Sequence, residues 1–296
     1  MARRRLSFEL SDRADAYLVG RKSKMRRPRV LYHYTTTQGL LGILKDKALF
    51  ATDSRYVNDS HELEHGKEAI RRVLNPVVDS VIADTVAKRA RSGFFSSEVF
   101  IASFSQRPDV LSQWRAYAAD GLGYAIGFAT SKPFYLEDVP IDVWPVTYDA
   151  KKQDGIVKYV LEQVLSRLSR GPLSVEQHQQ IHPAEISLAF RRILPIFKHP
   201  GFREELEWRA VVNSNSEVKK LIEFRPSKFG VAPFVRIKPH GDTLLPIASI
   251  WMGPRIDEQR GKSALRELLV ARGYKVAESG AGGRGVQVFR SRTTYV

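Results

Sequence analysis

Short strand-like stretches bounded by turn-forming residues dominate this chain, and they restrict its fold more than any other feature. They recur at 30–35, 98–105, 123–129 and around 143–148, and again in a cluster over the last third of the sequence. Parallel strands need long crossover connections, commonly helices, and too few helical stretches separate these strands to supply them. The pattern therefore predicts an α+β fold with mixed, mainly antiparallel sheets and flanking helices.

The predicted helices are few. A capped helix begins at Thr36 or Thr37, and its apolar positions recur at helical spacing. The amphipathic stretch at about 150–198 is predicted to form two helices, and we expect it to be an insertion in a single α+β domain formed by residues 30–296. Further helices are predicted at about 60–74, from Pro76, from Pro108 and at about 257–272. The late strand candidates are ELEWRAVVN, FVRIKP, IASIWMG, YKVAES and GVQVFR.

Composition narrows the class of protein. The 296 residues are 43% hydrophobic, which is enough for a full core. No apolar run approaches the ~18–20 residues that a membrane span needs, and no apolar signal-peptide region follows the charged N-terminus. The chain has no cysteine, which excludes disulfides and thiolate metal sites. We therefore expect a cytoplasmic protein without a membrane partner.

The N-terminus forms a strongly basic arm over residues 1–29. The first 30 residues hold ten Lys or Arg against three acidic residues, and the whole chain carries a net charge of +15. The rest of the chain is therefore basic as well. Each cation that meets a phosphate releases a counterion, so a polyanion is the natural partner. We expect the arm to contact DNA or RNA.

One motif suggests a metal. Residues 61–65 read HELEH, the H-E-x-x-H pattern of zinc proteases, which places both imidazoles on one face of a helix. Its flanks are polar, however, and no third ligand stands out downstream. We interpret the segment as a surface helix, and no metal is expected.

Two strand ends carry polar side chains suited to binding. His33 and Tyr34 end a strand directly before the capped helix, where the imidazole could donate to a ligand hydroxyl and the phenol ring could stack on a ligand ring. Ser103 and Ser105 flank Phe104 at another strand end, so that both hydroxyls are predicted to share one face.

A third strand begins with paired acids. Glu205 and Glu207 are predicted to share one face at the start of an apolar strand. Paired carboxylates can stabilise a developing cation and activate an acceptor. The alternative is an ion-paired sheet edge with Arg203 and Arg209.

The chain resembles a bacterial family of proteins of unknown function. The shared segments occur in order over roughly residues 30–280, and the basic arm lies outside them. They are LYHYTT, RYVNDSHE, ASFSQRPDVLSQWRAYA, GLGYAIGF, EELEWR and IWMGPR. The family name assigns no activity.

The order of three of these segments is similar, more distantly, to the NAD site of ADP-ribosyltransferases. A His-x-Thr strand, a Ser-x-Ser strand end and a Glu-x-Glu strand follow one another in that superfamily, whose DNA-modifying toxins and RNA 2′-phosphotransferases also begin with a His-x-Thr-type element. The resemblance implies a split β core. It needs a sizeable insertion between Ser105 and Glu205.

The resemblance also implies roles for individual residues. His33 would hold the NAD ribose and carboxamide, with Thr35 beside it. Glu207 would grip the ribose 2′-hydroxyl and stabilise the oxocarbenium-like transition state, and Glu205 would activate the acceptor. The remaining residues of the expected cofactor pocket are Tyr34, Tyr56, Asn58, Ser103, Ser105 and Trp114.

The leading hypothesis is an NAD-consuming enzyme of the ADP-ribosyltransferase or NAD glycohydrolase type, acting on nucleic acid or a nucleic-acid-bound target in a toxin or phage-defence setting. Two alternatives remain open at this point. One is a non-catalytic nucleic-acid-binding module on the same fold. The other is a metal-dependent hydrolase or nuclease that uses Asp59, Glu62 and the histidines.

Overall fold

The structure is a computed structural model. It describes residues 28–57, 62–74, 99–168, 189–190, 193–241, 243–278 and 284–294. Residues 1–27 of the basic arm, Asn58 and the predicted helix from Pro76 therefore lie outside the described residues, as does most of the second predicted helix of the insertion.

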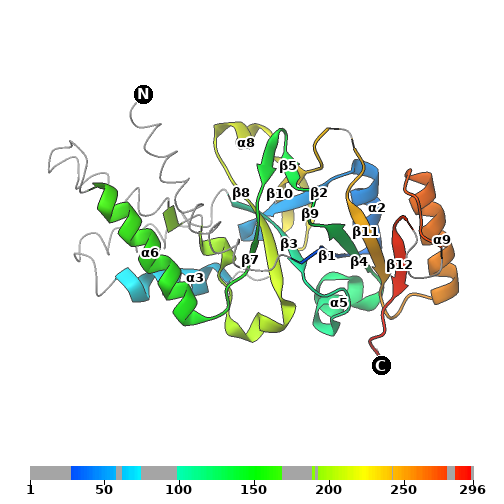
Figure 1. Cartoon of the computed structure of the whole chain (residues 1–296), viewed down its shortest axis with the longest axis horizontal. Coiled ribbons are helices and arrows are strands. Elements are labelled where there is room, and N and C mark those ends of the chain that lie inside the picture. The colour runs from blue at the N-terminus through cyan, green and yellow to red at the C-terminus, as the bar shows by residue number, and fades with distance from the viewer. Residues whose placement is uncertain are drawn as a thin grey trace.

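Most strands of the described chain belong to one large sheet (Figure 1). The strands are β1 (Val30–Thr35), β2 (Leu49–Asp53), β3 (Val99–Ser105), β4 (Tyr124–Ala129), β5 (Phe134–Leu136), β6 (Val139–Ile141), β7 (Val143–Pro145), β8 (Glu207–Asn213), β9 (Glu223–Ser227), β10 (Gly230–Ile237), β11 (Ile247–Met252) and β12 (Gln287–Arg290). The ten-stranded sheet has the order β12-β11-β4-β1-β3-β2-β10-β9, and β8 and β7 branch from β3. Its pairs are antiparallel except for β11 with β12.

The sheet divides at β3. One edge of β3 pairs with β8 from Val99 to Ser105. Along its other edge, Phe100 and Ile101 pair with β2, whereas Ser105 alone pairs with β1. Strands β1 and β2 therefore diverge beside the middle of β3. This gap positions the candidate site described below.

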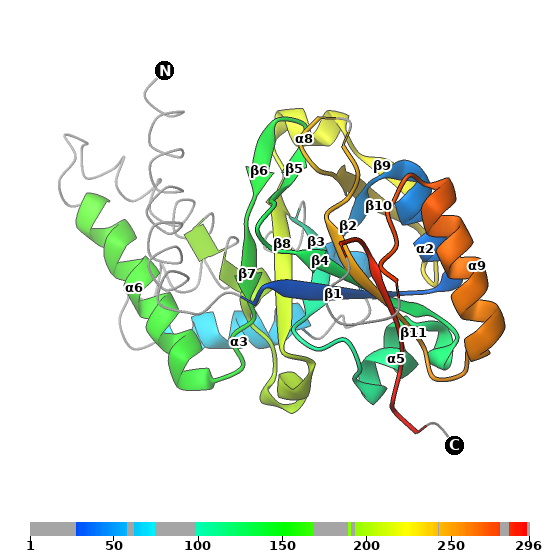
Figure 2. The ribbon, with the colours of Figure 1, turned by 45° about the vertical axis from the view of Figure 1, so that its right-hand side comes forward.

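Helices cover the sheet and extend one end of the molecule. They are α2 (Thr37–Asp46), α3 (Glu62–Leu74), α5 (Leu111–Tyr117), α6 (Ala150–Leu168), α8 (Ser216–Lys220) and α9 (Glu258–Ala271). The main core contains apolar side chains of α2 and α9 together with those of the sheet. A second core joins α3, α6 and the segment around Phe197, and these helices project from one end of the sheet (Figure 2).

The predicted fold class is confirmed, because the described chain is α+β with a mainly antiparallel sheet. Three local predictions were wrong. The strand predicted from Glu205 begins at Glu207, since Leu206 adopts a left-handed φ of 43° and Glu205 ends a 3₁₀ turn, Pro200–Glu205. In place of the strand predicted at YKVAES, the described residues of this segment form an isolated bridge, Val276 with Val286. The helix predicted from Pro108 begins at Leu111.

Strands β5, β6 and β9 and the helix α8 were not predicted. Among the helices of the described ranges, none is both long and apolar enough to cross a membrane.

Candidate functional site

A cavity of about 690 Å³ opens where β1 and β2 diverge from β3. Its walls come from β1, α2, β2, β3, α5, β8, β9 and the 3₁₀ turn Ser54–Tyr56. The residues of the expected NAD site that line it are His33, Tyr34, Thr35, Tyr56, Ser103 and Glu207. Helix α2 leaves the space open at Gly42, where an added Cβ would meet nothing within 4 Å.

His33 bridges the gap between β1 and β3. Its Nδ1 lies 2.9 Å from the Ser103 carbonyl oxygen, which can only accept, so Nδ1 carries the proton and donates. Burial lowers the pKa of His33 below its ordinary value; the bond to Ser103 opposes this shift and the charge of Arg225 adds to it. The ring is therefore neutral at pH 7 and its Nε2 accepts. His33 was predicted to donate to a ligand hydroxyl, whereas the neutral ring presents an acceptor at Nε2.

This assignment can be measured directly. We expect nitrogen NMR to find His33 neutral and protonated on Nδ1 at pH 7. Because the folded-state pKa is lowered, the unfolded chain binds a proton more readily, and stability falls as the pH drops below the ordinary imidazole value. His240, whose side chain is 65% exposed, is the internal reference. An imidazolium at position 33 at pH 7 would contradict the assignment.

Glu207 is buried in the cavity wall at the start of β8 and is held by cations. Arg209 donates to it with Nε at 2.7 Å and Nη2 at 2.9 Å, and Lys198 Nζ lies 3.0 Å from Oε2. Burial alone would raise the pKa of Glu207, but Arg209 and Lys198, with hydrogen bonds from Arg209 and Ser103, lower it to about 2. The carboxylate is therefore ionised throughout the physiological range.

Glu205 and Ser105 lie behind this wall. Both are buried, and neither lines the cavity. Glu205 pairs with Lys198 at 2.5 Å, and Ser105 Oγ donates to the Glu205 carbonyl at 2.7 Å. Since the strand starts after Glu205, the two glutamates do not alternate along it, yet Lys198 joins their carboxylates. Ser105 and Glu205 therefore hold supporting positions. Ser105 was predicted to shape the nicotinamide pocket and Glu205 to activate the acceptor, but neither lines the cavity.

Arg225 brings positive charge into the cavity from β9. Its Nη2 donates to Thr52 Oγ1 at 2.8 Å, and its buried Nε has no hydrogen-bond partner within the part of the chain that the structure describes. Burial lowers its pKa, and no acidic group contributes to that shift. A buried donor without a partner costs free energy, and an anion in the cavity would remove that cost.

The three aromatic residues of the expected pocket take different positions. Tyr56 lines the cavity, as does Tyr117, which was not predicted to do so. Tyr34 also lines it, but its hydroxyl donates to the Arg107 carbonyl and accepts from the Val110 amide, both at 3.0 Å, so its ring is held in place. Trp114 is fully buried and packs edge-on against Tyr34, with ring centroids 4.9 Å apart. It supports the wall and does not line the cavity.

The loop after β3 is fixed by Asp109. Trp114 Nε1 donates to Asp109 Oδ1 at 2.7 Å, and three donors come from the C-terminal segment: Ser291 Oγ at 2.5 Å, the Arg292 amide at 2.7 Å and Thr293 Oγ1 at 2.9 Å. Burial raises the pKa of Asp109, but these bonds outweigh it and the net shift is downward. We call this arrangement the Asp109 clasp.

Sequence reasoning missed Arg225 and Lys198. Lys198 is the last residue of the stretch predicted to form two helices, and no pattern marked it as a site residue. The ion pair between Arg209 and Glu207 is one that the alternative interpretation of the paired acids had predicted. Of the HELEH motif, His65 can be placed: its Nε2 lies 3.1 Å from Gln153 Oε1, and its ring packs against His199. No group of three or more potential metal ligands occurs among the residues described.

Comparisons with known proteins give three findings, on protein families, curated proteins and solved structures. A family described as "Protein of unknown function (DUF2971)" matches residues 113–210. No curated protein matches the chain.

Among solved structures, the chain is similar to the DarT of Thermus sp. 2.9, solved in complex with ADP-ribosylated ssDNA. The alignment covers 90% of this chain and 98% of that one, at 13% identity and a TM-score of 0.29. At that TM-score no role is carried over. The matched family confirms, over residues 113–210, the resemblance to a family of unknown function that the ordered segments indicated.

Proposed function

We propose that the cavity binds NAD and that the protein cleaves the bond between nicotinamide and ribose, as an enzyme of the ADP-ribosyltransferase or NAD glycohydrolase type. One observation carries the proposal. His33, Ser103 and Glu207 come from three strands far apart in the sequence, meet in one cavity and are linked by hydrogen bonds. These are the three elements that the resemblance to ADP-ribosyltransferases singles out.

The cavity suits a dinucleotide in size and chemistry. Its 690 Å³ lies within the range of about 300–1,000 Å³ that is usual for ligand pockets. Arg225 would pair with the diphosphate, and His33 Nε2 would accept from a ribose hydroxyl. Tyr56 and Tyr117 offer aromatic faces to a ring of the ligand.

The reaction needs no metal in this scheme. The C1′–N bond breaks and its electron pair passes to the ring nitrogen, so nicotinamide leaves as a neutral molecule. The ribose carbon becomes oxocarbenium-like, and the ionised Glu207 would stabilise the positive charge that develops there. Water or an acceptor group then bonds to C1′ and loses its proton to solvent.

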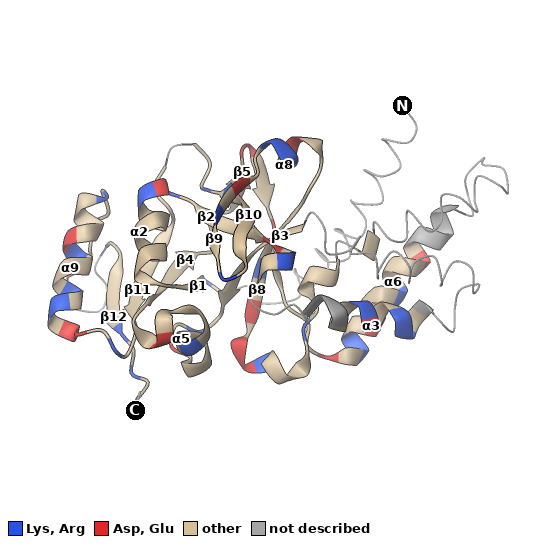
Figure 3. Cartoon of the chain, turned by 180° about the vertical axis from the view of Figure 1, so that it is seen from behind, with Lys and Arg blue, Asp and Glu red and all other residues tan. Residues whose placement is uncertain are grey.

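The acceptor in this proposal is nucleic acid or a nucleic-acid-bound target, in a toxin or phage-defence setting. The net charge of +15 supports it. Figure 3 shows basic residues spread over α3, α5, α8 and α9 and not gathered into one stripe. Residues 1–29 add a dense basic segment.

The test is nicotinamide release from NAD by the purified full chain, with a chelator present. We expect release that His33→Ala abolishes. Absence of both release and NAD binding would overturn the proposal.

A second candidate function is a nucleotide-binding module without catalysis. A carboxylate offers about four acceptor positions. Arg209 occupies two of those on Glu207, and Lys198 and Ser103 occupy the others. A ribose hydroxyl would have to displace one of these donors. NAD binding without nicotinamide release would decide for this candidate.

Arg225 allows a separate prediction about affinity. We expect Arg225→Gln to weaken NAD binding about 10- to 100-fold, because a hydrogen bond to a charged group contributes roughly 1.5–3 kcal/mol. Isothermal titration calorimetry would measure it. Arg255→Gln is the matched control, since Arg255 pairs with Asp120 on the surface and does not line the cavity. Equal affinity in the two variants would exclude Arg225 as an anion ligand.

A further inference from the structure

The edge of the sheet beside the cavity carries an exposed apolar face. Strands β9 and β10 form a hairpin in which Phe224 lies opposite Pro233 and Val231 opposite Pro226. Directly opposite and alternate residues share one face of a sheet, so these four side chains form a continuous patch. Phe224 is 67% exposed and Val231 62% exposed. A continuous exposed apolar patch commonly marks an interaction site, whereas single exposed apolar side chains do not.

The tip of the hairpin adds a second exposed ring. Phe229 is 52% exposed, and Lys228 Nζ lies 5.0 Å from its ring centroid. Over residues 223–237 the hairpin holds three cations, Arg225, Lys228 and Arg236, against the single acid Glu223. Arg236 is paired with both Glu223 and Asp46, and Arg225 lines the cavity. Lys228 is therefore the cation that lies beside the exposed rings, and Arg225 adds positive charge at the adjoining cavity.

We propose that this hairpin is the docking platform for single-stranded nucleic acid. Exposed aromatic rings stack on unpaired bases, and nearby cations follow the phosphates, which is how single strands are bound without sequence preference. Pro226 belongs both to the apolar face and to the cavity lining. A nucleic-acid strand bound on the hairpin would therefore reach the opening of the cavity. The inference that the docked nucleic acid is the acceptor of the reaction rests on the proposed function.

A second copy of the chain is a poorer occupant. Among the described strands, β9 lies at an edge of the sheet, where an added strand could pair with its backbone groups. Pro226, the fourth of its five residues, has no N–H to donate. A partner would therefore bind the hairpin through its exposed side chains more readily than by pairing with its backbone.

The experiment is a fluorescence anisotropy titration, without NAD, of the full chain with a labelled single-stranded DNA of about 12 nucleotides. We expect the Phe224→Ala/Phe229→Ala double variant to lose at least about tenfold in affinity, with an unchanged salt slope because no charge is removed. Affinity for a duplex of the same length should stay unchanged, since its bases are already stacked.

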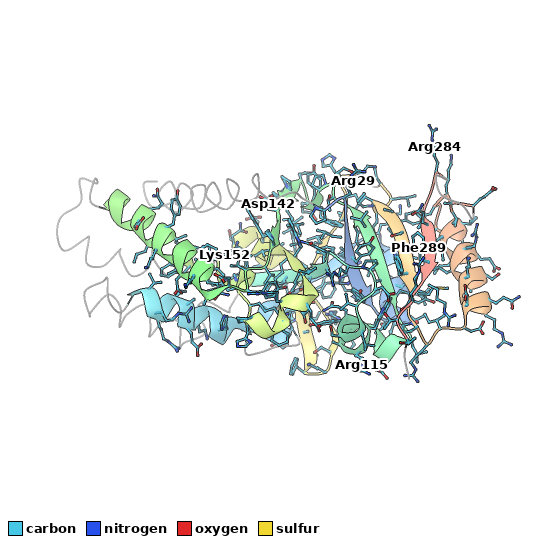
Figure 4. All side chains as sticks on the ribbon, turned by 60° about the horizontal axis from the view of Figure 1, so that its bottom comes forward. Arg29, Arg115, Asp142, Lys152, Arg284 and Phe289 are labelled. Atoms are coloured by element: carbon cyan, nitrogen blue, oxygen red, sulfur yellow. The ribbon has the colours of Figure 1, made fainter. Side chains whose placement is uncertain are left out.

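Phe289→Ala is the matched control. Phe289 is 38% exposed and lies on β12, at the opposite edge of the sheet (Figure 4). The single variant Phe229→Ala, at the hairpin tip, serves if the double variant does not fold. Unchanged single-strand affinity, an equal loss for the duplex, or an equal loss in Phe289→Ala would overturn the platform. Because NAD is absent, failure of nicotinamide release does not affect this result.

Discussion

Glu207→Gln is expected to lower nicotinamide release about 10²- to 10³-fold while NAD still binds. Removing one preorganised electrostatic stabiliser typically costs that much in rate. Gln keeps the shape of the side chain but not the charge that faces the developing cation. The ratio of turnover to NAD affinity, measured by product formation and calorimetry, separates this effect from a loss of binding.

The same substitution also tests the ion cluster. Gln would remove the negative charge that Arg209 and Lys198, both buried, share, while Lys198 would keep its pair with Glu205. Breaking a buried ion pair costs about 3–5 kcal/mol. Thermal unfolding must therefore accompany the rate measurement. Glu207→Asp keeps the charge and should retain the fold with intermediate activity.

Glu204→Gln is the control for both measurements. Glu204 is exposed, and the substitution makes the same chemical change three positions away. We expect it to leave rate and stability unchanged. If Glu207→Gln keeps full activity in a folded protein, Glu207 is structural and the catalytic proposal loses its central residue.

Asp109→Ala is expected to destabilise the fold by about 2–4 kcal/mol. The Asp109 clasp accepts four hydrogen bonds, and bonds to a charged group contribute roughly 1.5–3 kcal/mol each, less where solvent screens them. Loss of the carboxylate frees the C-terminal segment from the loop after β3. Urea unfolding would measure the change, with Asp138→Ala as control because the Asp138 side chain is 95% exposed.

The clasp also predicts a dependence on pH. The pKa of Asp109 is lowered in the folded state, so the stability it contributes is present above the ordinary carboxyl value of 3.8 and is lost as the pH falls through the folded-state value. In Asp109→Ala this acid-dependent component should be missing. An unchanged free energy of unfolding in Asp109→Ala would show that the clasp contributes nothing.

The sequence predicted the elements that follow simple periodicity. β1, β3, β4, α2 and α9 form as expected, because alternation or helical spacing decides them locally. The start of β8 depends on the left-handed Leu206, which no apolar pattern marks. β9 was missed because its alternation is broken by Pro226 and its apolar residues are exposed, contrary to the burial that strand patterns assume.

The site was predicted in outline through the order of its three segments. His33, Ser103 and Glu207 do meet, which periodicity alone could not indicate. The supporting positions of Trp114, Ser105 and Glu205 arise from packing behind the wall, and an isolated sequence does not reveal which side of a wall a residue takes. Arg225 enters the cavity only because β9 folds back along β10.

The divided sheet also determines at which stage of protein synthesis the cavity can form. Ser105 and Glu205, which are joined by a hydrogen bond, are 100 positions apart, and the last wall residues, Arg225 and Pro226, are held by β10, which ends at Ile237. Translation must therefore pass residue 237 before the cavity wall can be complete. A chain that ends before β10 would lack the strand that holds Arg225 and Pro226 in the cavity wall.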